Sequence, residues 1–204
     1  MSILFLATSN RHKIEELKAL LADLPVDLTS TLELTGIDVP AEDGATFAAN
    51  ARLKALHYAS VTGLAALADD SGLEVDALDG RPGVESARYA GAGASDQENR
   101  DKLLAELAAV PRAARTARFR CVVAVAHRGA VVLQADGSVE GEILAAERGA
   151  GGFGYDPLFF YPPLAKTFAE LSPSDKNAVS HRARALRALA APLRQYLSQP
   201  DDRT

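Results

Sequence analysis

The chain has 204 residues, of which 48% are hydrophobic and 24% charged, as expected of a globular protein with a substantial core. The net charge of −5 argues against binding to a nucleic-acid polymer, and no apolar run approaches the length of a membrane span. A single cysteine excludes a disulfide framework and a zinc-binding spacing. Because the N-terminus also lacks the basic start of a signal peptide, we expect a cytoplasmic protein.

The first predicted elements are a strand, a polar loop and a helix. Residues 3–7 are uniformly apolar, which is typical of a strand covered on both faces. Residues 8–13 follow, and Asn10 is a suitable N-cap for a helix that Pro25 closes. The free backbone N–H groups at such a helix start can hold a phosphate, with Lys13 adding a positive charge. An ordinary capped helix is the alternative.

A short strand at residues 26–28 precedes the second predicted helix, which begins at Thr46 and ends at Gly63. Asn50 and Lys54 lie four positions apart in this helix, so they share one of its faces. That face is directed either into a cleft or toward solvent.

Residues 64–72 are the most informative stretch, because an apolar run ends there in the adjacent carboxylates Asp69 and Asp70. The end of a buried strand is where α/β proteins place their chemistry. Adjacent carboxylates repel each other, and a divalent metal can hold them beside phosphates. Glu42 and Asp43 can add oxygen ligands. The alternatives are a polar turn at the aspartates and a solvated acidic loop at residues 42 and 43.

The following segments read as mainly structural. Residues 73–78 alternate as in a half-exposed strand, and Ser95 begins a capping box for a further helix. Residues 118–126 and 130–135 predict a hairpin. Arg88 is either a ligand contact or part of a salt bridge.

A glycine-rich stretch at residues 149–157 is the second informative segment, since four of the six residues from 149 to 154 are glycine. Glycine permits close approach of the backbone to a ligand. Phe153 can stack on a planar base, and Asp156 can accept hydrogen bonds from it. A flexible connector is the alternative.

The end of the chain predicts one long helix, which begins at Ser172-Pro173 and carries an apolar stripe as far as Leu197. Lys176 and Arg182 fall in its early turns. They are positioned to reach an anionic ligand and a base carbonyl respectively.

Five stretches in this order resemble one known family. They are residues 7–13, 42–51, 68–72, 151–157 and 180–182. Together they closely resemble the inosine triphosphatase-like family, the pyrophosphatases of non-canonical purine nucleoside triphosphates. The resemblance covers nearly the whole chain, although Ala49 stands where the family often has glutamate.

This resemblance implies an α/β fold with an elongated mixed β-sheet flanked by helices, in two lobes with the active cleft between them. Residues 1–204 would form a single two-lobed nucleotide pyrophosphatase domain. The activity implied is hydrolysis of ITP, dITP and XTP to the monophosphate and pyrophosphate. The resemblance also implies Mg²⁺ as cofactor and a homodimer that binds neither a membrane nor a nucleic-acid polymer.

The resemblance also assigns roles to individual residues. Asp70 would accept a proton from water and, with Glu42, hold Mg²⁺. The residues expected to bind the substrate are Thr8, Ser9, Asn10, Arg11, His12, Lys13, Ser71, Phe153, Gly154, Tyr155, Asp156, Lys176, His181 and Arg182.

Two other functions remain open from the residues alone. One is a phosphatase that forms an aspartyl-phosphate on Asp69 or Asp70, although such enzymes require an Asp-x-Asp spacing that is absent here. The other is a nucleotide sensor without turnover, which is disfavoured because adjacent carboxylates repel a triphosphate.

Overall fold

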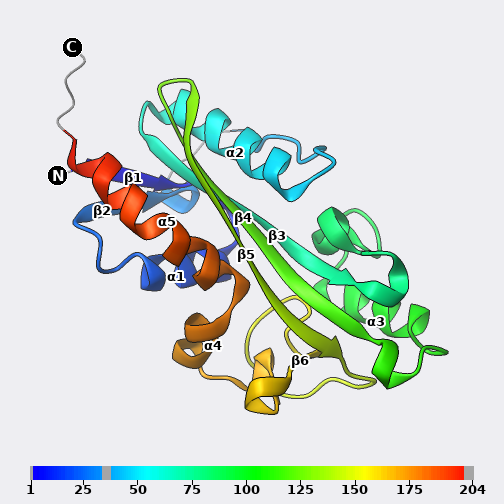
Figure 1. The fold of residues 1–204 in the computed structure, drawn as a ribbon. Helices are drawn as coiled ribbons and strands as arrows, with labels where there is room; N and C mark the ends of the chain where they lie inside the picture. Colours follow the sequence, from blue (N-terminus) through cyan, green and yellow to red (C-terminus); the bar gives the residue numbers. More distant parts are fainter. Residues whose placement is uncertain (1, 34–37, 200–204) are drawn as a thin grey trace. The chain divides into compact units, whose positions relative to one another are not determined.

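The computed structural model describes residues 2–33 and 38–199, and within them one mixed sheet is flanked by helices, as predicted (Figure 1). Along the sheet the strand order is β2-β1-β3-β4-β5-β6-β7. The strands are β1 (Ser2–Leu6), β2 (Val26–Ser30), β3 (Ala65–Val75), β4 (Thr116–His127), β5 (Ala130–Ile143), β6 (Phe159–Tyr161) and β7 (Lys166–Thr167). The α-helices are α1 (Arg11–Leu20), α2 (Phe47–Thr62), α3 (Asp96–Glu106), α4 (Pro173–Val179) and α5 (His181–Ser198).

The sheet is parallel at one side and antiparallel at the other. Strand β1 pairs in parallel with both β2 and β3, whereas β6 pairs antiparallel with β5 and β7. Strands β4 and β5 are joined by Arg128 and Gly129, which both have positive φ angles, 52° and 78°. Such a two-residue turn is typical of a tight hairpin.

The chain divides into two compact units. Unit 1 comprises Met1–Asp70, Val122–Gly137 and Ala183–Thr204, and unit 2 comprises Ser71–Cys121 and Ser138–Arg182. Three of the boundaries fall within β3, β4 and β5 and the fourth within α5, so each of these elements contributes residues to both units.

The core of unit 1 is built around β1. Leu4, Phe5 and Leu6 are consecutive and fully buried, as predicted for a strand covered on both faces, whereas Ile3 at the start of the same run is 43% exposed. Phe5 packs against Tyr58 of α2, with ring centroids 5.5 Å apart.

The core of unit 2 centres on three phenylalanines. The rings of Phe119 and Phe159 lie 4.5 Å apart, and those of Phe159 and Phe168 lie 4.9 Å apart. Leu73 of β3 and Leu103 of α3 belong to the same buried cluster.

Local signals predicted several helix ends correctly. Asn10 caps α1 by accepting a hydrogen bond from the Lys13 N–H, and Thr46 caps α2 in the same way. Gly63 ends α2 with φ 70°. Helix α1 ends at Leu20, earlier than the predicted end at Pro25.

Two predictions of element extent are wrong. The expected strand end at Asp69 is absent, because β3 continues through both aspartates to Val75 as one strand of 11 residues. The expected single C-terminal helix is two helices, since Ser180 between α4 and α5 is extended, with φ −64° and ψ 159°. No helix within residues 2–33 and 38–199 is long and apolar enough to cross a membrane.

Candidate active site

The two adjacent aspartates lie inside strand β3 and are both buried. Consecutive side chains of a strand point to opposite faces, and these two carboxylates meet different lysines. Asp69 Oδ2 lies 3.0 Å from Nζ of Lys13 in α1, and Asp70 Oδ1 lies 3.0 Å from Nζ of Lys54 in α2. Two ammonium groups therefore offset the carboxylate repulsion for which the sequence suggested a metal.

Lys54 is the centre of a polar cluster in unit 1. Its Nζ lies 3.2 Å from Glu42 Oε1 as well as 3.0 Å from Asp70 Oδ1, and its side chain is only 7% exposed. Asn50, one turn earlier in α2, donates from Nδ2 to Asp70 Oδ2 at 3.2 Å. The shared face of Asn50 and Lys54 thus points inward. Lys54 was missing from the predicted site, although its spacing from Asn50 was the available signal.

The acidic loop is tied to α2 through Gly44. The Gly44 N–H donates to Asn50 Oδ1 at 2.8 Å, and a Cβ atom added at Gly44 would lie only 2.5 Å from that oxygen. A residue with a side chain would therefore disturb this contact. Glu42, two residues earlier, is kept within reach of Lys54.

Burial and charge shift the pKa values of the two central groups. Burial raises the pKa of Asp70, and the positive charges of Lys54 and Lys13 reduce that rise without cancelling it. Burial lowers the pKa of Lys54, but the three neighbouring carboxylates outweigh burial and the net shift is upward. Asp70 is therefore a stronger base than an ordinary aspartate, beside a lysine that stays charged.

The carboxylate oxygens in this cluster suit a hard divalent cation. Glu42 and Asp70 both direct an oxygen at one point, the Lys54 ammonium. No group of three or more His, Cys, Asp or Glu side chains within the described residues is arranged to hold a metal ion. Mg²⁺ commonly uses only one or two carboxylates and completes its shell with water and substrate phosphates. Glu42 and Asp70 are thus the residues of this cluster that could hold a divalent cation.

The loop between β1 and α1 presents the predicted phosphate-binding residues. Asn10 Oδ1 accepts from the Lys13 N–H at 3.2 Å, and the Asn10 N–H donates to Thr8 Oγ1 at 3.3 Å. The Thr31 hydroxyl donates to the Thr8 carbonyl. The exposed members of the predicted set are Ser9, Asn10, Arg11 and His12. This loop therefore offers an accessible helix N-terminus to an anion.

Unit 2 brings together the residues predicted to bind a base. Lys176 Nζ lies 4.6 Å from the centroid of the Phe153 ring, and Arg182 Cζ lies 5.9 Å from it. Arg182 Nη2 donates to Ser71 Oγ at 3.1 Å. An aromatic ring, two cations and a hydroxyl from distant parts of the sequence thus form one group.

The remaining predicted residues of unit 2 make contacts within the protein. Asp156 Oδ2 accepts from Lys176 Nζ at 2.6 Å and from the Phe153 N–H at 2.9 Å, and so orients both residues. The Tyr155 hydroxyl donates to the Ser86 carbonyl at 2.9 Å, and burial raises its pKa. The His181 ring stacks on Phe119 with centroids 4.8 Å apart.

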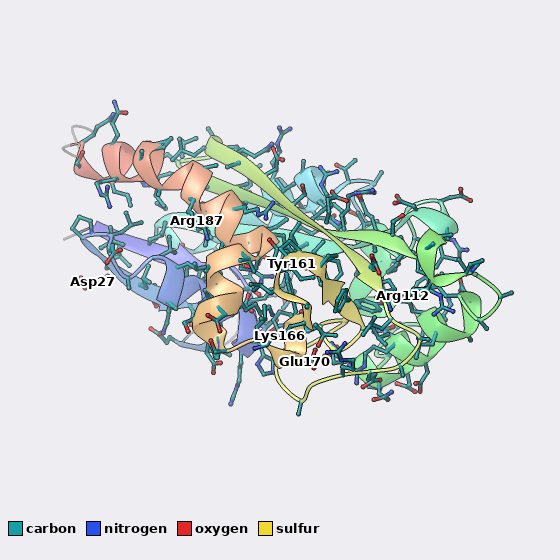
Figure 2. The ribbon with its side chains drawn as sticks, turned by 60° about the horizontal axis from the view of Figure 1, so that its bottom comes forward. Asp27, Arg112, Tyr161, Lys166, Glu170 and Arg187 are labelled. Atoms are coloured by element: carbon teal, nitrogen blue, oxygen red, sulfur yellow. The ribbon has the colours of Figure 1, made fainter. Side chains whose placement is uncertain are left out.

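The backbone of the glycine-rich segment lies close to other atoms of the protein. At Gly152, where φ is 72°, an added Cβ would lie 2.1 Å from Asp156 Oδ2. Upstream of it, Arg148 pairs with Glu170 at 3.0 Å (Glu170 is labelled in Figure 2). The segment thus makes defined contacts within unit 2.

Arg88 forms a salt bridge, with its Nε 2.6 Å from Glu85 Oε2, which was one of the two alternatives for this residue.

The fold is that of an α/β protein in which unit 1 presents groups suited to an anion and unit 2 presents groups suited to an aromatic ring. Comparison with known proteins then identifies the family. The Ham1 family matches residues 4–192, and the chain belongs to this family. The resemblance inferred from five short motifs is therefore confirmed.

Relatives and solved structures agree over nearly the full length. A dITP/XTP pyrophosphatase from Pectobacterium atrosepticum is 51% identical over 95% of this chain and 99% of its own. A dITP/XTP pyrophosphatase from Geobacter sulfurreducens is 52% identical over 93% of this chain and 95% of its own. The structure of a HAM1 protein from Coxiella burnetii matches with a TM-score of 0.87 and 44% identity, over 96% of this chain and all of that one.

Proposed function

We propose that this protein hydrolyses the non-canonical purine nucleoside triphosphates ITP, dITP and XTP to the nucleoside monophosphate and pyrophosphate. It is a hydrolase that acts on acid anhydrides and cleanses the nucleotide pool. The names and the high identity of its relatives support this activity. The structural observation that carries the proposal is the buried Asp70, whose carboxylate contacts the Lys54 ammonium. Glu42 contacts the same ammonium.

In this proposal residues 1–204 act as one nucleotide pyrophosphatase domain in which the two units have different roles. Unit 1 supplies the groups that act on the triphosphate, which are the loop from Thr8 to Lys13 and the cluster around Asp70. Unit 2 supplies the groups that bind the base. Asp70 and Ser71 are consecutive residues of β3, so one strand carries residues of both groups.

The chemistry proposed is attack of water on the α-phosphorus. Asp70 accepts the proton of the attacking water, and its raised pKa suits it to this role. A new bond forms between the water oxygen and the α-phosphorus, the bond from that phosphorus to the bridging oxygen breaks, and pyrophosphate leaves. Lys13 balances negative charge on the phosphates. Glu42 and Asp70 would hold Mg²⁺, which when bound neutralises phosphate charge and activates water.

Base selection follows from the hydrogen-bonding polarity of Arg182. A guanidinium only donates, so it suits the keto oxygen at the purine 6-position and not the amino group of adenine. A donor left buried without a partner costs about 1–3 kcal/mol. We therefore expect kcat/KM to be higher for ITP and XTP than for ATP, and equal values for ITP and ATP would refute this explanation.

Analysis of the products separates the candidate functions. Hydrolysis in ¹⁸O-labelled water should release unlabelled pyrophosphate and place the label in the monophosphate. An aspartyl-phosphate phosphatase would release inorganic phosphate instead, and a sensor would release neither product. Label in pyrophosphate would show attack at the β-phosphorus and contradict the proposed chemistry.

The assembly and location proposed are a homodimer in the cytoplasm, without a membrane or nucleic-acid partner. The family resemblance supports the dimer, and the acidic net charge of −5 disfavours a nucleic-acid partner. Light scattering on the purified protein tests the dimer, since a mass of about 21.5 kDa at micromolar concentration would contradict it.

A further inference from the structure

Helix α3 holds the loop that carries Phe153 through the backbone N–H and the backbone carbonyl of Gly154. The Gly154 N–H donates to Asp96 Oδ2 at 2.6 Å, and the Gly154 carbonyl accepts from Arg100 Nη1 at 2.8 Å. We propose that Asp96 and Arg100 are positioning residues that fix Phe153 for the purine base. This inference rests on the proposed function, in which Phe153 contacts the base.

Helix α3 is built to leave Asp96 available for this contact. Ser95 caps the helix in a capping box with Glu98, so the helix start is already satisfied without the Asp96 side chain. Arg100 lies four residues after Asp96, which puts both side chains on one helix face. On that face the Asp96 carboxylate accepts from the Gly154 N–H, and the Arg100 guanidinium donates to the Gly154 carbonyl.

Neighbouring side chains fix the orientation of Arg100. Its Nε donates to Glu147 Oε1 at 2.9 Å, and its Nη2 donates to Gln97 Oε1 at 2.7 Å. Gln97 in turn donates to the same Glu147 oxygen at 2.9 Å. The hydrogen bond from Arg100 lowers the pKa of Glu147, because it stabilises the charged carboxylate. The guanidinium therefore has a bonded partner in each of three directions.

Phe153 is thus held from two sides through backbone groups. Its own N–H donates to Asp156 Oδ2 at 2.9 Å, and the next N–H along the chain, that of Gly154, donates to Asp96. A segment so rich in glycine has many alternative conformations in the absence of such contacts. Affinity falls in proportion to the fraction of molecules with the loop in its binding conformation.

The expected effect is on binding of the base and not on chemistry. Asp96→Ala should raise the KM for ITP about 10- to 150-fold, the value of one hydrogen bond to a charged group, with kcat nearly unchanged. Asp96→Asn should restore most of the affinity, because the amide oxygen can accept from the same N–H. Asp101→Ala is the matched control, since Asp101 lies on α3 and contacts Gln97 but not Gly154.

A double-mutant cycle distinguishes positioning from general damage to the fold. In a Phe153→Ala background, Asp96→Ala should change the KM for ITP less than 2-fold, because the side chain that it positions is gone. An equal Asp96→Ala penalty in both backgrounds would overturn the proposal.

The closing experiment measures the solvent accessibility of residue 153 directly and does not depend on activity. The chain contains no tryptophan, so Phe153→Trp introduces a single fluorescent reporter into the loop. Adding Asp96→Ala should increase quenching of this indole by acrylamide at least 2-fold, whereas adding Asp101→Ala should leave it unchanged. Equal quenching in all three proteins would overturn the positioning role. If the wild-type protein does not hydrolyse ITP while quenching follows the prediction, the proposed function fails and the positioning of residue 153 stands.

Discussion

Replacing Lys54 by methionine tests whether the polar cluster of unit 1 is held as described. The change keeps most of the side-chain volume and removes the ammonium group. Asp70, whose side chain is 8% exposed, would lose its contact at 3.0 Å with that group. It would keep the hydrogen bond from Asn50 at 3.2 Å.

The size of the effect follows from the geometry. Two unit charges 3.0 Å apart attract by about 5 kcal/mol at an effective dielectric constant of about 20. Removing one partner of a buried pair typically costs about 3–5 kcal/mol, because the other charge stays buried. The contact with Glu42, which is 36% exposed, adds less than about 1 kcal/mol. We therefore expect Lys54→Met to lower the free energy of unfolding by about 3–5 kcal/mol.

Guanidinium chloride unfolding of four proteins measures this prediction: wild type, Lys54→Met, Asp70→Asn and the double variant. The double variant should be more stable than Lys54→Met, because a neutral amide at position 70 leaves no unpaired charge. Lys18→Met is the control, since Lys18 and Glu33 are both about half exposed and 3.9 Å apart, and should change stability by less than about 0.5 kcal/mol. A cost below about 1 kcal/mol for Lys54→Met, or additive costs in the cycle, would refute the reasoning.

Three further predictions concern other parts of the chain. Arg115→Leu should lower stability by about 2–4 kcal/mol, because the buried Arg115 donates to the Leu107 and Val110 carbonyls, both at 2.9 Å. Thermal unfolding measures this, and an unchanged Tm would contradict it. The hydrogen bond from Thr116 lowers the pKa of Asp76. The stability that this bond gives the folded protein is therefore present above the pKa of Asp76 in the unfolded chain, and it is lost as the pH falls through the pKa of Asp76 in the folded protein. Tm measured between pH 5 and 3 should accordingly fall less for Thr116→Val than for wild type, and parallel curves would argue against this linkage. Pyrophosphate release should stop in chelator and return with Mg²⁺, whereas full activity in chelator would remove the metal from the mechanism.

Local signals predicted much of the fold. Asn10, Thr46 and Gly63 act at helix ends through their own backbone or side chains, so their effect depends on neighbouring residues alone. The uniform apolar run of β1 predicted burial on both faces for the same reason. These features need no knowledge of distant contacts.

The continuation of β3 through Asp69 and Asp70 depends on distant contacts and was therefore missed. Aspartate, serine and glycine are usual turn formers, and a buried strand containing them requires partners for the charges. Those partners, Lys13 and Lys54, come from helices α1 and α2. Sequence alone did not pair each lysine with its carboxylate.

The predicted site was incomplete for a similar reason. The helix that begins at Ser95 was interpreted as structural, because its capping box explained its polar start. Asp96 and Arg100 reach Gly154 across more than fifty residues of sequence, as the tertiary structure alone reveals. The break at Ser180 was also missed, because the residues on either side of it continue a helical pattern.

The central claim is that Asp70 performs the chemistry while other residues bind the substrate, and the kinetics of Asp70→Asn with dITP test it most directly. The variant keeps the shape of the side chain but removes the proton acceptor. We predict that kcat falls by at least about 10²–10⁴-fold, as is typical for the loss of a general base, while KM changes only a few-fold. A kcat close to that of the wild type would contradict the claim and assign the proton acceptor to another residue, with Asp69 the next candidate.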